Sequence, residues 1–574
     1  MRQRQMLTRP GLLCLLLILL APACLAGAWP APPSAAIASA HPAATEAGIR
    51  ILRQGGNAFD AAITVTAALA VVEPYSSGIG GGGFYLLHKA EEGLTTMLDA
   101  RERAPFAASR DMYIGSDGEP TKASLEGPLS AGIPGIPAAL VELAIAHGRL
   151  SLQQTLQPAI DLAVKGFAVD EHYRRMARMR LELLQRYPET AAIFLLENQV
   201  PPVGHVIRQP DLARTLSRIA VYGNTGFYSP LAAGGMVDKV HRDGGIWSLK
   251  DLAEYRVVYR EPVTTRYGDW QVTSAAPPSS GGVALATMFA ILSHYELGTM
   301  SEGQRYHHII EVMRHAYRDR AEYLGDPDHV TVPIDKLLSP ASIRSKLEWI
   351  REDEATPSAS LPPVPVDSAR GQDTTHFSIL DGQGNRVSAT LSINYPFGSG
   401  YVIPGTGILL NDEMDDFSAR PGSPNAYGLV GAEANAIAPG KRPLSSMSPT
   451  FLDRDDKLVI LGTPGGSRII TMVLLGALEA MRGGTADDVA SLARLHHQYL
   501  PDKVVFEEGA ISDSARDELT LLGHELQQLE SPYGNMQVVI WNRQSGEVDA
   551  ASDPRGAGSA AVLPGPGVAQ AAAN

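Results

Sequence analysis

Residues 374–392 read TTHFSILDGQGNRVSATLS, a pattern of two strands around one turn. The turn, Asp381 to Asn385, is rich in the Gly, Asn and Asp residues that tight turns favour. If the hairpin is centred on Gln383, one face is mostly apolar and the other carries hydroxyl and imidazole groups. A slip by one residue would destroy this separation, so the pattern also predicts the register. The predicted opposing pairs are Thr374–Ser392, Thr375–Leu391, His376–Thr390, Phe377–Ala389, Ser378–Ser388 and Ile379–Val387.

The segment before this hairpin has a different composition. Residues 352–373 are rich in Pro, Ser, Ala and Asp, lack apolar periodicity, and predict a flexible surface linker. Thr374 therefore begins a strand and faces Ser392, with Asn394 two residues further along the same face. From this pattern alone, Thr374 is either an ordinary exposed residue at a strand edge or a nucleophile.

A threonine nucleophile needs a base to remove the proton of its weakly nucleophilic hydroxyl. A free backbone α-amine, with an ordinary pKa of about 8, can do this for its own residue. That amine exists only if the peptide bond between Asp373 and Thr374 is cut. A loose linker before a rigid strand allows such a cut, so the second alternative is an N-terminal threonine nucleophile.

The whole chain has 574 residues, of which 44% are hydrophobic and 19% charged, and this excludes a largely disordered protein. Its net charge of −14 argues against nucleic acid or an anionic lipid surface as the main partner. Residues 1–28 contain Arg2, Arg4 and Arg9, an apolar run, and Ala-Gly-Ala before Trp29. They predict a signal peptide, and we expect a periplasmic or secreted protein.

Both cysteines, Cys14 and Cys24, lie in this predicted signal peptide. The rest of the chain therefore has no disulfide, no cysteine nucleophile and no cysteine metal site. The alternative is a lipoprotein anchored through Cys24, although residues 21–23 match a lipid-attachment signal poorly.

Upstream of the linker, the sequence predicts helices from near Pro42 and over residues 58–72. A glycine-rich run at 77–83 precedes a strand-like segment at 84–87. Nucleotide-binding glycine loops follow a strand and precede a helix, so this run predicts close backbone packing instead. Residues 130–350 predict a mainly helical region.

Downstream of the linker, strand patterns alternate with helical ones. The predicted strands cover residues 375–380, 386–394, 458–461 and 537–541, and a helix is predicted over 469–482. The adjacent pairs His307-His308 and His496-His497 point to different faces, so we expect no metal site.

From Asp373 onward the sequence closely resembles the γ-glutamyltranspeptidases (glutathione hydrolases) of the N-terminal-nucleophile hydrolase superfamily. The resemblance spans about residues 38–560 in family order. The matching segments are 41–42 (HP), 55–62 (GGNAFDAA), 101–105 (RERAP), 321–327 (AEYLGDP), 374–378 (TTHFS), 407–418 (GILLNDEMDDFS), 441–450 (KRPLSSMSPT), 465–468 (GGSR) and 551–555 (ASDPR).

The resemblance implies an α+β fold, a four-layer αββα sandwich formed by two chains from one precursor. The precursor cuts itself between Asp373 and Thr374. A large, mainly helical subunit would cover 29–373, ending in the linker 352–373, and a small subunit would cover 374–574. Thr374 would then be the N-terminal nucleophile.

The resemblance also implies roles for residues at the ends of a γ-glutamyl group. Arg101 matches the arginine that binds the α-carboxylate through its guanidinium fork, assisted by the hydroxyls of Ser445 and Ser446. Glu413 and Asp416 match the carboxylates that bind the α-ammonium, with Asn394 nearby. Asp415, between them, we interpret as structural.

Further positions match the groups around the reacting carbonyl. Gly465 and Gly466 match the oxyanion-binding backbone, where glycine allows close approach. Ser392 stands where the family usually has Thr, and its hydroxyl would bond to Thr374. Losing the methyl leaves the rotamer less fixed, so maturation is expected to be slower. Tyr427 matches the gating tyrosine of a lid loop over residues 421–432.

The implied activity is hydrolysis of glutathione and γ-glutamyl amides, or transfer of the γ-glutamyl group to an amino acid or dipeptide acceptor. No cofactor, metal or nucleic acid is implied, and the two subunits would form a heterodimer. The first alternative is a glutaryl or cephalosporin acylase of the same fold. The second is a non-enzymatic exported binding protein, which would remain uncut.

Overall fold

Two β-sheets pack face to face in the computed structural model, which describes residues 31–362, 374–419 and 432–565. The first sheet has the strand order β20 (Ser559–Pro564), β1 (Ser34–Ser39), β9 (Thr375–Leu380), β10 (Arg386–Ser392), β2 (Gly82–Lys89), β3 (Leu94–Asp99), β6 (Val258–Arg260). The second has the order β19 (Val548–Ser552), β18 (Gln537–Asn542), β14 (Lys457–Gly462), β13 (Thr450–Arg454), β8 (Trp270–Ser274), β7 (Val263–Tyr267). All neighbours within both sheets are antiparallel.

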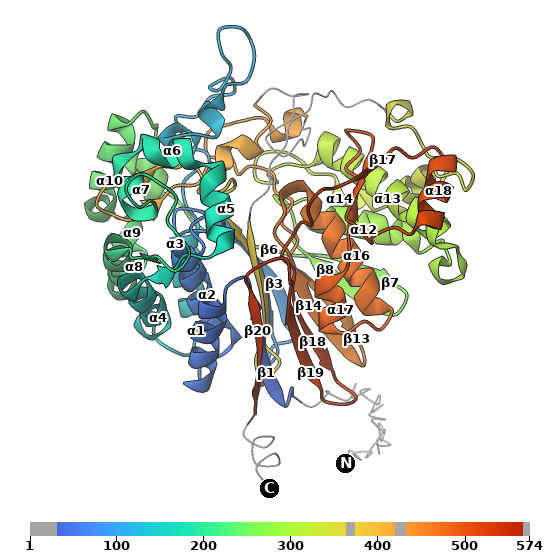
Figure 1. Ribbon diagram of the computed structural model, residues 1–574, viewed down its shortest axis with the longest axis horizontal. Helices are drawn as coiled ribbons and strands as arrows, with labels where there is room; N and C mark the ends of the chain where they lie inside the picture. The colour runs from blue at the N-terminus through green and yellow to red at the C-terminus, as the bar shows by residue number, and fades with distance from the viewer. Residues whose placement is uncertain (1–30, 363–373, 420–431, 566–574) are drawn as a thin grey trace, which may run out of the picture.

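Helices lie outside both sheets, and Figure 1 shows the two groups on opposite sides of the molecule. The group beside the first sheet comprises α1 (Pro42–Arg53), α2 (Ala58–Val72), α3 (Ile136–Ala146), α4 (Leu152–Lys165), α5 (Glu171–Met179), α6 (Leu181–Arg186), α7 (Pro188–Phe194), α8 (Pro210–Tyr222), α9 (Thr225–Tyr228) and α10 (Pro230–Arg242). The group beside the second sheet comprises α12 (Gly281–Leu292), α13 (Glu302–Tyr323), α14 (Ile334–Leu337), α16 (Ile469–Met481), α17 (Ala486–Ser491) and α18 (Asp513–Leu521).

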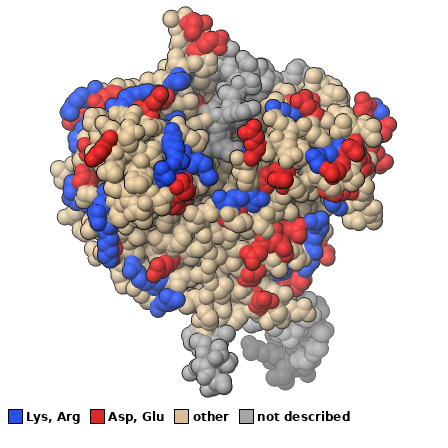
Figure 2. All heavy atoms as spheres, viewed as in Figure 1, with Lys and Arg blue, Asp and Glu red and all other residues tan. Residues whose placement is uncertain are grey.

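Short elements complete the described fold. They are helices α11 (Leu249–Ala253) and α15 (Pro340–Leu347), and strands β4 (Phe167–Ala168), β5 (Val206–Ile207), β11 (Val402–Ile403), β12 (Ile408–Leu409), β15 (Leu495–His496), β16 (Val504–Phe506) and β17 (Leu526–Gln528). No helix within the described ranges is both long and apolar enough to cross a membrane. The face drawn in Figure 2 carries acidic and basic side chains interspersed with one another.

The central hairpin forms in the predicted register, with Phe377 opposite Ala389 and Ser378 opposite Ser388. Its apolar face packs in the core shared with α2, where Phe377 and Val387 are fully buried. The turn closes through Asp381, whose carboxylate accepts hydrogen bonds from the N–H groups of Gln383 and Asn385. The same carboxylate accepts the N–H of Ala58, so the turn also caps the start of α2.

The polar face of the hairpin meets the second sheet. His376 bonds to Thr390 (Nδ1 to Oγ1, 2.8 Å), and burial lowers the pKa of His376 to about 3, so its imidazole is neutral. Gly462 lies against this imidazole, and a Cβ at that position would collide with the ring. The Ser388 hydroxyl donates to the Leu461 carbonyl (3.1 Å), which joins the two sheets by a hydrogen bond.

The glycine-rich run before β2 packs against backbone, as predicted. A Cβ at Gly80 would collide with the Leu409 carbonyl, and a Cβ at Gly81 would collide with the Ser392 carbonyl. These contacts place β2 and the segment before it directly against the end of β10.

Two expectations about the region before residue 373 are corrected. The helical interpretation of residues 130–350 is wrong for 258–274, where β6, β7 and β8 form because apolar and polar residues alternate around a Gly268-Asp269 turn. The predicted surface linker 352–373 is wrong at its start, because Ser358 and Leu361 are buried. The Ser358 N–H donates to Asp502 (2.6 Å), so the loop between β15 and β16 holds this segment.

Several predicted features lie outside the described residues: the signal peptide 1–28 with Cys14 and Cys24, linker residues 363–373 with Asp373, and the lid tyrosine Tyr427.

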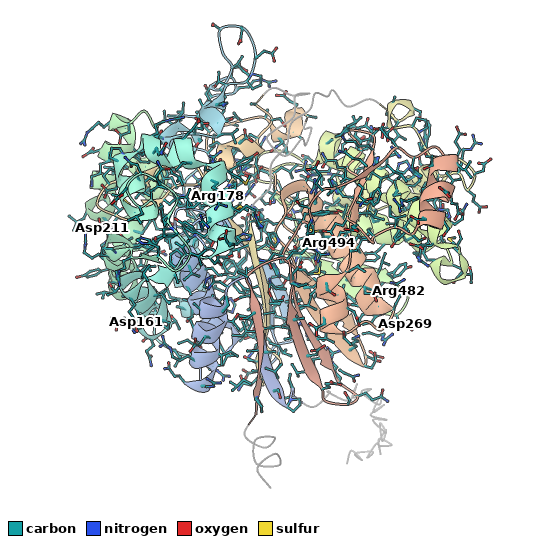
Figure 3. All side chains as sticks on the ribbon, in the orientation of Figure 1. Asp161, Arg178, Asp211, Asp269, Arg482 and Arg494 are labelled. Carbon is teal, nitrogen blue, oxygen red and sulfur yellow. The ribbon has the colours of Figure 1, made fainter. Side chains whose placement is uncertain are left out.

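The segment 551–555, one of the matching segments quoted above, contributes a buried ion pair. Asp553 accepts hydrogen bonds from Arg494, which is labelled in Figure 3, and from the N–H of Met536 (3.0 Å). Arg494 is 1% exposed. This pair ties the loop after β19 to the helices over the second sheet.

Candidate active site

Thr374 lines a small cavity at the end of the central hairpin. Eight residues predicted from the sequence share it, together with Arg320, Met447 and Ile469; the eight are Thr374, Ser392, Asn394, Glu413, Asp416, Ser445, Ser446 and Gly466. Its volume is about 20 Å³, close to what one water molecule needs. A ligand larger than water therefore requires the walls of the uncut chain to move.

The end of β10 places Ser392 and Asn394. The Ser392 Oγ accepts a hydrogen bond from the N–H of Asn394 (2.7 Å), which fixes the serine oxygen beside the strand end. Asn394 has a positive φ of 74°, which Asn tolerates better than most residues, and its amide donates to the Asp412 carbonyl (3.0 Å). The predicted bond between the Ser392 and Thr374 hydroxyls stays a prediction.

The predicted oxyanion glycines lie directly before α16. Gly466 has a φ of 55° and lines the cavity, and Gly465 precedes it with a φ of 140°. In the described part of the chain, no hydrogen-bond acceptor lies on either N–H. Free N–H groups at the start of a helix favour negative charge, so this corner of the cavity can stabilise an oxyanion.

Glu413 and Asp416 form one acidic wall, and Arg101 is paired with both of them. Glu413 and Asp416 lie on the short helical turn Glu413–Asp416. Arg101 is also held by a loop carbonyl, because its Nε donates to Pro443 (3.2 Å). Burial raises the pKa of Glu413 to about 7, although Arg101 opposes that rise. Arg101 is 0% exposed and does not line the cavity in the uncut chain.

Two unpartnered atoms give the cavity its recognition chemistry. Within the described residues, Ser446 Oγ and Glu413 Oε2 are buried without a hydrogen-bond partner. The first can donate to a carboxylate, and the second can accept from an ammonium group. Ser445 supports this corner structurally, because its Oγ accepts the N–H of Met447 (3.1 Å).

Asp415 points elsewhere, as the structural interpretation expects. Its carboxylate accepts a hydrogen bond from the Ser124 hydroxyl (2.7 Å), and it does not line the cavity.

Arg320 is a cavity residue that sequence reasoning missed. It lies near the end of α13, is 4% exposed, and donates from Nε to the Ser280 hydroxyl (3.1 Å). Burial lowers its pKa to about 10, so it remains charged at neutral pH. The sequence feature that could have indicated Arg320 is its position immediately before the matching segment 321–327. The cavity thus has a guanidinium of its own, that of Arg320, in addition to Arg101, which pairs with the acidic wall without lining the cavity.

Glu73 is a second functional-looking residue that the sequence did not indicate. It follows α2, is 3% exposed, and accepts a hydrogen bond from the Thr375 hydroxyl (2.7 Å). Burial raises the pKa of Glu73 to about 7. The neighbour of the candidate nucleophile is therefore held by a group that titrates near neutrality.

This chain is similar to known glutathione hydrolases and to solved structures of related enzymes. The chain is 39% identical to the glutathione hydrolase proenzyme of Escherichia coli (strain K12), over 90% of each chain, and 42% identical to that of Pseudomonas sp. (strain A14), over 85% of this chain and 86% of the relative. Among solved structures, it resembles the cephalosporin acylase from Bacillus halodurans with a TM-score of 0.81 and 26% identity, covering 93% of this chain and 96% of that one.

The Helicobacter pylori γ-glutamyltranspeptidase structure matches with a TM-score of 0.55 and 36% identity, covering 57% of this chain and 94% of that chain. The family model named Gamma-glutamyltranspeptidase matches residues 44–563. The mixed α+β fold, the cavity and these matches together show that the chain belongs to the γ-glutamyltranspeptidase family.

Proposed function

We propose that this protein is a self-processing glutathione hydrolase and γ-glutamyltransferase. One observation carries the proposal: Thr374 shares a cavity with Ser446 and Glu413, each of which has an unpartnered buried oxygen, and with Gly466. These groups complement a free carboxylate, a free ammonium and a developing oxyanion, and a γ-glutamyl amide carries the first two on its α-carbon and develops the third at its γ-carbonyl.

The reaction begins when the Thr374 Oγ attacks the γ-carbonyl carbon and the α-amine of Thr374 takes the hydroxyl proton. The oxyanion rests on the N–H groups of Gly465 and Gly466. It collapses to a γ-glutamyl ester, and the leaving amine, cysteinylglycine when glutathione is the substrate, receives the proton. Water or an acceptor amine then attacks the ester, and the Thr374 hydroxyl is restored.

Binding of the γ-glutamyl end requires the ion pairs around Arg101 to rearrange. The substrate ammonium would take Glu413 and Asp416, with Asn394 nearby, while the α-carboxylate would take Ser445, Ser446 and a guanidinium. Arg101 becomes available when the ammonium replaces it at the carboxylates. This exchange keeps the buried charges balanced.

The proposal includes a precursor cut between Asp373 and Thr374 and a heterodimer of the two products. The four-layer αββα arrangement of the N-terminal-nucleophile hydrolases is part of the same proposal. It is supported by the packing of two sheets between two groups of helices. A periplasmic or secreted location, after removal of residues 1–28, rests on the sequence pattern alone.

A glutaryl or cephalosporin acylase is the second candidate, because the acylase structure matches over 93% of the chain. A glutaryl group lacks the α-ammonium. The acidic wall of Glu413 and Asp416 would then have no ligand charge to bind, and this favours the γ-glutamyl substrate.

The test is intact mass spectrometry of the purified protein under denaturing conditions, followed by turnover assays with glutathione and a glutaryl amide. We expect two chains, the smaller beginning at Thr374, and turnover of glutathione in preference to the glutaryl amide. A Thr374→Ala variant should remain one chain and be inactive. A wild-type chain that stays uncut in fresh and aged samples would favour the binding-protein alternative.

A further inference from the structure

Three buried side chains outside the active site converge on one point. His307 and Glu311 lie four residues apart on α13 and therefore project from the same face of the helix. His524 follows α18 and approaches them from the small-subunit part of the sequence. One ligand atom from each of the three lies within 4.8 Å of the others. The exposed fractions of His307, Glu311 and His524 are 0%, 0% and 5%, so bulk solvent does not hydrate these polar side chains.

The hydrogen bonds of His307 define which ring nitrogen faces the cluster. Its Nε2 lies 2.6 Å from the Arg351 carbonyl, and a carbonyl only accepts, so Nε2 carries the proton. Nδ1 therefore carries a lone pair and accepts a hydrogen bond from the Nε2–H of His524 (2.8 Å). A metal ion between the two nitrogens would replace that proton, and the His524 ring would then carry its proton on Nδ1. A histidine whose far N–H is fixed by a backbone carbonyl is the usual form of a metal ligand.

Glu311 has one carboxylate oxygen, Oε2, that is available as a metal ligand. Its Oε1 accepts the Arg314 Nε–H and the Thr356 N–H, both at 3.3 Å. In the described ranges, its Oε2 is buried without any hydrogen-bond partner. A buried carboxylate oxygen left in this way is a costly arrangement that a bound cation would relieve.

The charges around the cluster leave room for a cation. The positive group that contacts Glu311 is Arg314, and it is paired with Asp502 as well. The two carboxylates thus outnumber the guanidinium by one. His497, which contacts Asp502 (3.1 Å), adds no charge when neutral, and burial lowers the pKa of His497 to about 4.

The spacing of the two nitrogens suits an ion with ligands near right angles. Two ligands at about 2.1 Å from an octahedral ion lie about 3.0 Å apart, and the observed separation is 2.8 Å. A tetrahedral ion would need the two rings to move apart by a few tenths of an ångström. Two imidazoles and one carboxylate suit Zn²⁺, Ni²⁺ and Co²⁺ better than Mg²⁺ or Ca²⁺.

We propose that His307, Glu311 and His524 bind one divalent transition-metal ion that links the two parts of the chain. His307 and Glu311 precede residue 373 and His524 follows it, so the ion would join the two subunits. Arg351 and Thr356, which support the ligands, belong to the segment that leads toward the cut. The link between separate chains rests on the proposed cleavage, whereas the ion site itself does not.

The signal in the sequence was incomplete. His307 and Glu311 have a spacing that helical metal sites use, but the third ligand is 217 residues away from His307. The neighbouring His308 faces Tyr295 instead, with ring centroids 4.1 Å apart, so the adjacent pair does not act together.

The test uses untagged, full-length protein that has been treated with a chelator and desalted. Titration with Zn²⁺ by calorimetry, and with Co²⁺ by visible absorption, should show one saturable site per chain. Zn²⁺ should also raise the temperature of thermal unfolding. His524→Gln and Glu311→Gln should each weaken binding by at least about 100-fold, and the matched control His308→Gln should leave it unchanged.

The Thr374→Ala variant separates this proposal from the proposed function. Its uncut chain should bind Zn²⁺ as tightly as the wild type does, even though it is inactive. Absence of a saturable one-to-one site for both metals in the wild type would overturn the proposal. So would wild-type affinity in both ligand variants, and if one of them fails to fold, the other decides.

Discussion

Arg101 and Glu413 form a buried ion pair although 312 residues separate them in the sequence. The pair links the loop after β3 to the wall of the Thr374 cavity. In the uncut chain Arg101 pairs with one Glu413 oxygen, Oε1, and in the proposed reaction each residue would exchange this partner for one charged group of the substrate. The pair therefore has a structural role and a binding role at the same site.

Replacing Arg101 by Lys should separate these roles. Lysine keeps the charge but loses the fork that reaches Glu413 and Asp416 together. We expect kcat/KM for glutathione to fall by at least about 100-fold, mainly through KM. Steady-state kinetics measures this, and the unfolding temperature shows whether folding also suffers. Unchanged KM in a folded variant would remove Arg101 from substrate binding.

Arg320 should contribute to binding through its charge in the cavity. We expect Arg320→Ala to raise KM for glutathione by about 10-fold or more, since a charged hydrogen bond contributes about 1.5–3 kcal/mol. Arg318→Ala is the matched control, because Arg318 pairs with Glu322 on the same helix and does not line the cavity. Equal effects of the two variants would argue for a general effect on α13.

Gly466 should be required for the oxyanion corner. Its φ of 55° disfavours any side chain, and a displaced N–H weakens oxyanion binding. We expect Gly466→Ala to lower kcat by about 100- to 1,000-fold. Gly483→Ala is the control: Gly483 has a φ of 109° and open space around it, so it tests backbone strain alone. A kcat loss of the same size in the control would contradict the assignment.

Glu73 should make stability depend on pH. The folded-state pKa of Glu73, about 7, lies above its ordinary value of 4.5, so the folded protein keeps a proton that the unfolded chain releases between these values. Its stabilising contribution is present below pH 4.5 and is lost as pH rises through 7. The loss amounts to about 3 kcal/mol.

The Glu73→Gln variant should therefore lack this loss. Denaturant unfolding at pH 5 and pH 8 gives the change in the free energy of unfolding for the wild type and for the variant. Subtracting the two changes isolates Glu73, because other buried acids such as Glu413 contribute equally to both proteins. An identical fall in stability for both proteins would rule out Glu73 as its source.

Ser392→Thr tests the departure from the family pattern. The added methyl restricts the side-chain rotamer, so the hydroxyl beside Thr374 should be better fixed. We expect faster conversion of the precursor to two chains. Denaturing gel electrophoresis of samples taken over time measures the rate of this conversion. Ser392→Ala should slow the same conversion. A Ser392→Thr variant no faster than wild type would show that the lost methyl does not limit maturation.

The hairpin was predictable because its signals are local. The turn residues Asp381 to Asn385 and the two-residue alternation on each side specify register without help from the rest of the chain. The alternation at 263–274 is a similar local signal, but it lies within a long stretch of mainly helical pattern that masks it.

Features that depend on distant partners were not predictable in this way. Ser358 has the composition of a linker residue, but its hydroxyl donates a hydrogen bond to the Tyr499 carbonyl, 141 residues away in the sequence. In the sequence, Arg320 resembles any charged residue of an amphipathic helix. In the structure it bonds to Ser280 and lines the cavity. The resemblance to a family located Glu413 and Asp416, but it could not show that Arg101 occupies them in the uncut chain.

The ends of the described chain lie side by side, and this has a use in protein engineering. Ser34, at the start of β1, is paired with Pro564, at the end of β20, and the Gly565 N–H donates to the Pro33 carbonyl (2.8 Å). A short turn could join these strands as it would in a hairpin. A circularly permuted gene built on that join could begin at Thr374, so that translation itself, followed by removal of the initiator methionine, would generate the reactive amine.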